Sequence, residues 1–125
     1  MESMREQIRK AKVTGGEKAE LPWASYRFDE KFSGFDGHFP GQPILPGVFM
    51  VMAAVVTLED WLACDVRVLE VHKTRFVSPI IPGQELEVRC RQYQQRNGSN
   101  VAQFTLRGAA DRKTSECMLY VDAHG

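Results

Sequence analysis

The stretch GHFPGQPILPG (residues 37–47), followed by the apolar run VFMVMAAVVTLEDWLA (residues 48–63), is the most informative part of this chain. Three prolines fix the backbone angle φ in the first stretch, and glycines lie among them. The apolar run predicts a helix, so Pro46 and Gly47 lie at its start, where backbone N–H groups lack partners within the helix. Such groups bind a polarised oxygen atom. With His38 held nearby, the pattern indicates acid–base chemistry on a carbonyl compound.

Strands are expected on both sides of this helix. The helix predicted over residues 48–63 is apolar on every side for its first three turns, which is typical of a helix that is buried all round. Residues 85–91 alternate between apolar and charged side chains, the period of a half-buried strand. One buried helix with antiparallel strands predicts an α+β architecture in a single domain, residues 1–125. The expected strands are 5–13 and 18–30, around a turn at 14–17, and then 66–77, 85–91, 101–107 and 115–121, with a hairpin turn at 96–99.

Composition narrows the function classes. The chain has 125 residues, 43% of them hydrophobic, which argues against disorder. Its 16 basic and 16 acidic side chains cancel, so nothing favours nucleic acid or an anionic membrane as partner. Three widely spaced cysteines predict free thiols in a reducing cytosol, with no metal site and no cofactor. No secretory signal and no apolar run of about 20 residues are present, so we expect a cytoplasmic protein without membrane insertion.

Two segments resemble one enzyme family. Residues 38–48 resemble the signature His-Phe-Pro-Gly-x-Pro-x-x-Pro-Gly-Val of the β-hydroxyacyl-acyl-carrier-protein dehydratases, FabZ and FabA. Residues 74–83, TRFVSPIIPG, look like the family's Ala-Arg-Phe-x-x-Pro-Val-x-Pro-Gly segment. The similarity covers about residues 18–122 and implies the hotdog fold, an antiparallel sheet wrapped around one long buried central helix. The N-terminal helical segment of FabZ proteins is expected to be missing.

The resemblance also implies roles for individual residues. His38 matches the catalytic base that takes the C2 proton of a 3-hydroxyacyl thioester, and the backbone N–H groups of Gly47 and Val48 match the donors to the enolate-like oxygen. Fourteen positions after His38 the family has Glu or Asp, which helps water leave, whereas this chain has Met52. A thioether cannot transfer a proton, and such help is typically worth about 10² to 10⁴ in rate. Candidates for lining an acyl tunnel are Phe39, Phe49, Met50 and Phe76, although such residues more often belong to the core.

Other titratable residues are weaker candidates. Glu59 lies two helical turns beyond Met52, about 10 Å along the axis, too far to replace the acid. Glu59 and Asp60 are expected to face solvent or a partner. Asp36 is expected to orient His38 or to cap a turn, and the other histidines, His72 and His124, are expected at the surface.

The resemblance implies a dimer, because in this family His from one subunit meets the acid of the other. The chain is therefore expected to form a homodimer, or a heterodimer with a Glu-bearing homologue, and to act on acyl carrier protein or CoA thioesters in fatty-acid or polyketide-type biosynthesis. The alternatives are a non-catalytic acyl-binding subunit and a hotdog acyl thioesterase, although Met52 counts against the thioesterase. An acyl carrier protein is acidic and would dock on a basic patch. The candidate residues for such a patch are Lys10, Lys12, Arg75, Arg89 and Arg91, although they more often are scattered charges in contact with solvent.

Overall fold

The computed structural model describes residues 2–16, 19–35, 44–96 and 99–124, without the side chains of residues 96, 123 and 124. Among these, no helix is long and apolar enough to cross a membrane. The elements in chain order are α1 (Met4–Lys10), β1 (Lys12–Gly15), β2 (Trp23–Arg27), a 3₁₀ turn (Ser33–Phe35), α2 (Gly47–Leu62), β3 (Asp65–Phe76), β4 (Glu85–Arg96), β5 (Ser99–Arg107), a second 3₁₀ turn (Ala109–Asp111) and β6 (Lys113–His124).

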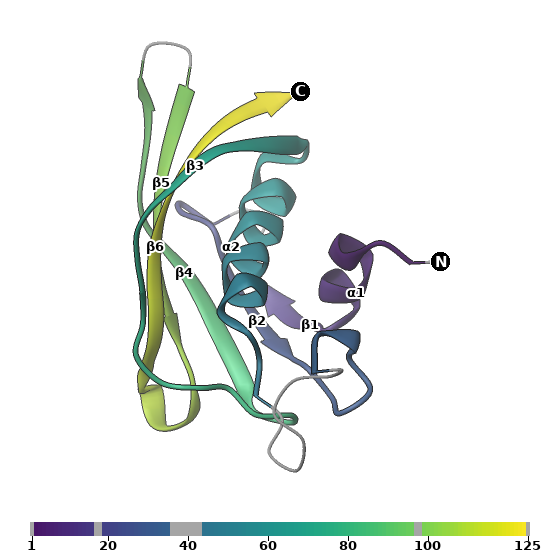
Figure 1. Ribbon diagram of the computed structural model, residues 1–125. Helices are drawn as coiled ribbons and strands as arrows, with labels where there is room; N and C mark the ends of the chain where they lie inside the picture. Colours follow the sequence, from purple (N-terminus) through teal and green to yellow (C-terminus); the bar gives the residue numbers. More distant parts are fainter. Residues whose placement is uncertain (1, 17–18, 36–43, 97–98, 125) are drawn as a thin grey trace.

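The strands form one six-stranded antiparallel sheet in the order β1-β2-β4-β5-β6-β3. The sheet curves around α2, and α1 packs on the other side of that helix (Figure 1). The predicted α+β architecture, a sheet around a central helix, is therefore confirmed. β3 lies at one edge of the sheet, and among the described strands it pairs only with β6.

Helix α2 begins and ends within one residue of its prediction. It ends because Ala63 adopts a left-handed conformation (φ 57°) and the Cys64 N–H donates to the Glu59 carbonyl at 3.3 Å. Residues 53–59 are all buried. Val48, in contrast, is exposed and Met52 is half-buried, so the expectation of burial on every side holds only for the middle of the helix. The first two turns keep one face that this chain does not cover.

The N-terminal segment differs from its prediction. Residues 5–13 were expected to form a strand, and no N-terminal helix was expected, yet residues 4–10 form helix α1. Ser3 caps this helix, because its hydroxyl accepts the Glu6 N–H at 3.2 Å. The pattern Ser3-x-x-Glu6 is a capping box, the local sequence signal for a helix start. Ile8 is the buried residue of α1.

Strand β4 is longer than predicted. The clean alternation of residues 85–91 breaks at a register shift between Cys90 and Gln92, where one residue is inserted opposite β5. Pairing resumes beyond this bulge and continues to Arg96. The bulge changes the apparent period, so the pattern alone ends the strand too early.

The core lies between the sheet and α2. Tyr26 on β2 is fully buried, and its hydroxyl lies 2.9 Å from Thr57 Oγ1 on α2. Thr57 in turn donates to the Ala53 carbonyl at 2.7 Å. Burial raises the pKa of Tyr26, so the phenol stays protonated and bonded. This polar contact fixes the helix against the sheet.

Glu59 is buried, contrary to the expectation that it faces solvent or a partner. Its carboxylate accepts Arg5 Nε at 3.0 Å, Arg9 Nη2 at 3.1 Å and the Val66 N–H at 3.0 Å. Asp60 beside it pairs with Arg9 Nε at 2.9 Å. The last turn of α2 is thus joined to α1 and to the start of β3, and both acids serve the fold.

Candidate functional site

A cavity of about 600 Å³ opens at the N-terminal end of α2. We call it the helix-start cavity. Its size suits a small-molecule ligand, and its walls are largely apolar. They come from the chain just before α2, from the first turn of α2, and from the end of β3 with the turn that follows. The lining residues are Ile44, Leu45, Pro46, Gly47, Val48, Met50, Phe76, Val77, Ser78 and Pro79.

The start of α2 supplies hydrogen-bond donors to this cavity. Pro46 is the N-cap and makes no side-chain hydrogen bond to the helix, and the first turn contains no acidic residue. The first N–H groups of a helix have no partner within it, and the helix dipole places partial positive charge there. Gly47 and Val48 both line the cavity. This arrangement can stabilise negative charge that develops on an oxygen atom.

Phe76 lies directly against Gly47. A Cβ atom built on Gly47 would lie 2.5 Å from Cζ and 2.6 Å from Cε1 of the Phe76 ring. Any larger residue at this position would therefore push the ring away from the helix start. The glycine of the motif is explained here by close packing, because the ring covers the first turn of α2.

Burial shows which end of the helix-start cavity is closed. Leu45 and Met50 are 2% and 3% exposed, so they form its floor. Val48 and Phe76 are 59% and 51% exposed, so they stand at its mouth. The cavity thus runs from the open side of the helix start inward to the protein core.

Not all of the predicted site residues reach this cavity. His38, Phe39 and Asp36 lie outside the described residues, and the described chain resumes at Ile44 in the cavity wall. Of the other tunnel candidates, Met50 and Phe76 line the cavity. Phe49 does not, because its ring packs edge-on against Phe32, with centroids 5.5 Å apart.

Met52, at the position of the family's acid, also does not line the helix-start cavity. It is half-buried and packs against the core. Met50 and Met52 are separated by about 200° around the helix at 3.6 residues per turn. Met52 therefore lies on another side of α2 from Met50, close to the face of the exposed Val48, without lining this chain's own cavity.

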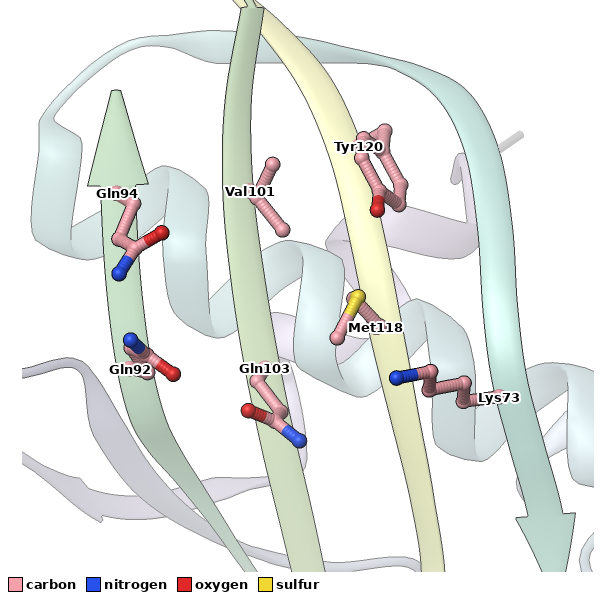
Figure 2. Close-up of a pocket in the computed structure, with 7 residues that line it drawn as sticks. All are labelled: Lys73, Gln92, Gln94, Val101, Gln103, Met118 and Tyr120. Atoms are coloured by element: carbon pink, nitrogen blue, oxygen red, sulfur yellow. The ribbon is translucent and has the colours of Figure 1, made fainter. Parts of the chain in front are cut away.

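A second cavity, of about 240 Å³, lies on the other side of the sheet (Figure 2). Its side chains project from β3, β4, β5 and β6 on the face turned away from α2. Carboxamides, a hydroxyl and an ammonium group make this lining polar, unlike that of the helix-start cavity. The lining residues are Lys73, Gln92, Gln94, Val101, Gln103, Met118 and Tyr120.

The remaining titratable groups of the described residues do not build a site. All three cysteines are free, as predicted, and burial raises the pKa of Cys90 to about 11 and that of Cys117 to about 12. Thiols of this kind are poor nucleophiles at neutral pH. His72 is exposed on β3, as predicted, whereas the His124 side chain lies outside the described part. Among the described residues, no group of His, Cys, Asp and Glu could hold a metal ion.

The candidate cations for carrier-protein docking are largely occupied. Lys10 pairs with Glu2, Lys12 Nζ lies 3.0 Å from Asp60 Oδ2, and Arg89 Nε lies 2.8 Å from Glu87 Oε1. The other two, Arg75 and Arg91, are on β3 and β4. The ion pairs of Lys10, Lys12 and Arg89 offset much of the positive charge of these three side chains. Docking of a carrier protein on a basic patch stays a prediction.

Comparison with known families and curated proteins points in one direction. A family model described as ApeI-like, ApeI dehydratase, matches residues 16–117. The 3-hydroxyacyl-[acyl-carrier-protein] dehydratase FabZ of Granulibacter bethesdensis is 36% identical over 87 residues, 62% of this chain and 49% of the relative. FabZ of a Ruegeria species is 30% identical over 86 residues, 62% of this chain and 54% of the relative. The chain spans about half the length of these curated relatives.

Solved structures agree on the fold. A structure described as the dehydratase heterocomplex ApeI:P from Xenorhabdus doucetiae superposes with a TM-score of 0.71 at 20% identity, covering 89% of this chain and 96% of that chain. A 1,4-dihydroxy-2-naphthoyl-CoA thioesterase from Synechocystis gives a TM-score of 0.67 at 10% identity, covering 82% and 81%. At these identities the likeness shows the fold alone, and the predicted hotdog fold is confirmed.

Proposed function

Because the chain belongs to the ApeI-like dehydratase family, we propose that it is a FabZ-like 3-hydroxyacyl-thioester dehydratase, or one subunit of such an enzyme. Its place is fatty-acid or polyketide-type biosynthesis in the cytoplasm, with substrates carried on acyl carrier protein or CoA. The helix-start cavity supports this function, because it joins apolar walls to the donors at the start of α2, directly after the segment that contains His38.

Dehydration removes the C2 proton and the C3 hydroxyl group, and it forms a C2–C3 double bond and water. In the proposed reaction, His38 takes the C2 proton. The N–H groups of Gly47 and Val48 stabilise the negative charge that develops on the thioester oxygen. The C3–O bond then breaks as the leaving hydroxyl group receives a proton. The apolar walls hold the acyl chain and keep water from the reacting atoms.

The proton for the leaving group has no donor at Met52. We propose that the site containing this chain's His38 is completed by a second subunit. Either a homologue with Glu or Asp at the matching position supplies the acid, or a second copy of this chain completes a site in which water or another residue replaces the acid. Met52 does not line this chain's own cavity, which supports this division. The solved dehydratase heterocomplex of the same fold makes such a two-chain arrangement a concrete expectation.

The surface supports a partner at β3. Most exposed large apolar side chains lie on β3, just after it, or at the start of α2, and β3 is an edge strand. Pairing of a second subunit along this edge would satisfy its free backbone groups and cover these side chains. The side chains are Val48, Leu69, Val71, Phe76, Val77 and Ile81.

The test is the reverse reaction, hydration of a short trans-2-enoyl thioester, measured with the purified chain and with the His38→Ala variant. Turnover that disappears in the variant supports a dehydratase whose acid is replaced by water or another group. If the wild-type chain is folded but inactive, the assay is repeated with a Glu-bearing homologue. Inactivity there too, or turnover that survives His38→Ala, refutes the proposal.

The same samples address the thioesterase alternative. Release of free thiol from a saturated acyl thioester would indicate hydrolysis instead of hydration. Met52→Glu provides a second control on the missing acid. If the chain is a weak dehydratase alone and the variant is no faster, the missing acid does not limit its rate.

A further inference from the structure

We propose that the cavity of about 240 Å³ on the outer face of the sheet, the face turned away from α2, is a second binding site, and that its ligand is a small polyhydroxylated carboxylate such as a sugar acid (Figure 2). We call it the outer-sheet cavity. The sheet separates it from the helix-start cavity, and no described residue lines both. Binding there does not depend on whether the chain is a dehydratase.

A bulge in β4 turns two glutamines onto the outer face. Alternate residues of a strand share one face, and Cys90 is buried in the core, so Gln92 and Gln94 would also point inward in a regular strand. The register shift between Cys90 and Gln92 reverses this alternation. Gln92 therefore lies opposite Gln103 on β5, and both carboxamides line the outer-sheet cavity.

A second irregularity, in β3, brings Lys73 to the same cavity. His72 pairs with Met118 and packs its ring edge-on against Tyr120, with centroids 4.9 Å apart, so His72 lies on the outer face. Lys73, the next residue, would point inward in a regular strand. It instead has a φ of 50°, in the left-handed region that is unfavourable for a residue with a side chain, and its side chain lines the outer-sheet cavity. Backbone strain of this kind is typical of functional sites.

The chemistry of the lining indicates the class of ligand. Among the described lining residues, Lys73 is charged and no side chain is acidic. Lys73 also takes part in none of the ion pairs found within the described ranges, so its ammonium group can balance the single charge of a carboxylate.

The other lining groups suit hydroxyl groups on a small molecule. The three glutamine carboxamides both donate and accept hydrogen bonds, as hydroxyl groups do, and the Tyr120 phenol does the same. Val101 and Met118 offer apolar contact to C–H groups between the hydroxyl groups. The volume of about 240 Å³ is below the range typical of drug-sized ligands, so the cavity fits a small metabolite.

The experiment uses gluconate as the probe, because it joins one carboxylate to several hydroxyl groups. Calorimetry on the purified full chain measures affinity, and two-dimensional amide NMR shows where gluconate binds. We expect saturable binding in the millimolar range or tighter, with shifts concentrated in the glutamine side-chain amides and in residues 72–74. Sorbitol has the hydroxyl groups without the charge and acetate has the charge without the hydroxyl groups, so each should bind at least about 10-fold more weakly.

Three variants locate the site. Lys73→Met removes the charge of an exposed side chain and should weaken gluconate binding about 10-fold or more. Gln103→Leu removes a neutral donor and acceptor and should weaken it about 5-fold. Lys113→Met is the matched control, because Lys113 is also on β6 of the same sheet, pairs with Glu116 and does not line the cavity. Its affinity should stay within about 2-fold of wild type.

Binding of gluconate that Lys73→Met weakens and Lys113→Met does not would support the site. The absence of saturable binding, NMR shifts confined to the helix-start cavity, or equal affinities of wild type and Lys73→Met would overturn it. Inorganic phosphate that binds at the same residues more tightly than gluconate would overturn the assignment of a carboxylate. These measurements do not involve turnover, so a failed hydration assay overturns the proposed dehydratase activity and leaves the result for this cavity unaffected.

Discussion

Replacing Glu59 with glutamine should destabilise the protein strongly, although the two residues have nearly the same volume. The carboxylate is 1% exposed and accepts hydrogen bonds from Arg5, Arg9 and the backbone of Val66. Glutamine removes the charge and turns an NH₂ group toward one of these donors. Breaking a buried ion pair costs about 3–5 kcal/mol. Because the arginine side chains are 44% and 36% exposed and can rehydrate, we expect about 2–3 kcal/mol here.

This free energy predicts a measurable shift in melting temperature. With an unfolding entropy of about 2.1 cal/mol/K per residue, 125 residues give about 0.26 kcal/mol/K, so Glu59→Gln should lower Tm by about 8–12 °C. Urea denaturation should give the matching loss of free energy, and hydrogen exchange should speed up in α1.

The matched control is Glu85→Gln, which removes a carboxylate that pairs with Arg27 at 3.2 Å on the surface. Both side chains there are about half exposed, at 48% and 54%, so the loss should stay below about 1 kcal/mol, or about 4 °C. Equal losses in the two variants would refute the reasoning that burial, rather than pairing itself, makes Glu59 important.

Three further changes test other parts of the structure. Gly47→Ala should displace the Phe76 ring and cost about 1–3 kcal/mol of stability by overpacking, and calorimetry that shows no loss would contradict the close contact. Tyr26→Phe should cost about 1 kcal/mol in urea denaturation, since only the buried hydroxyl's bond is lost; a stabilised variant would speak against that bond. At pH 8 a thiol reagent should modify the half-buried Cys64 first. Cys90 is buried and its pKa is raised to about 11, so it should stay protected until the protein unfolds. Mass spectrometry that shows both cysteines modified at the same time would count against this order.

The parts predicted well from sequence are those fixed by local chemistry. Pro46 and Gly47 mark the start of the apolar run, and a run of that length predicts a helix, so α2 was predicted within one residue. α1 had a local signal too, the capping box of Ser3 and Glu6, but residues 5–13 were interpreted as a strand beside the turn at 14–17. The end of β4 was missed because a bulge after Cys90 changes the period.

Other features depend on contacts between distant residues, which no local pattern contains. Glu59 is buried because Arg5 and Arg9, 54 and 50 residues earlier, fold against it. Likewise, which methionine faces the cavity depends on how α2 is rotated against the sheet. Met50 and Met52 stand in the same apolar run, and the structure separates them, because Met50 lines the helix-start cavity and Met52 does not. The role of His38 stays a prediction, since it lies outside the described residues.

The strand order has a consequence for synthesis of the protein in the cell. In the part of the chain that the structure describes, β3 pairs only with β6, and the paired residues are separated by 39 positions for Phe76 and Ser115 and by 59 for Asp65 and His124. At a translation rate of about 5–20 residues per second, β3 waits about 2–12 s for its partner to be made. During that interval both of its edges are unpaired and its apolar side chains are uncovered. The nascent chain is therefore most prone to aggregate, and most in need of a chaperone, just before its last strand emerges from the ribosome.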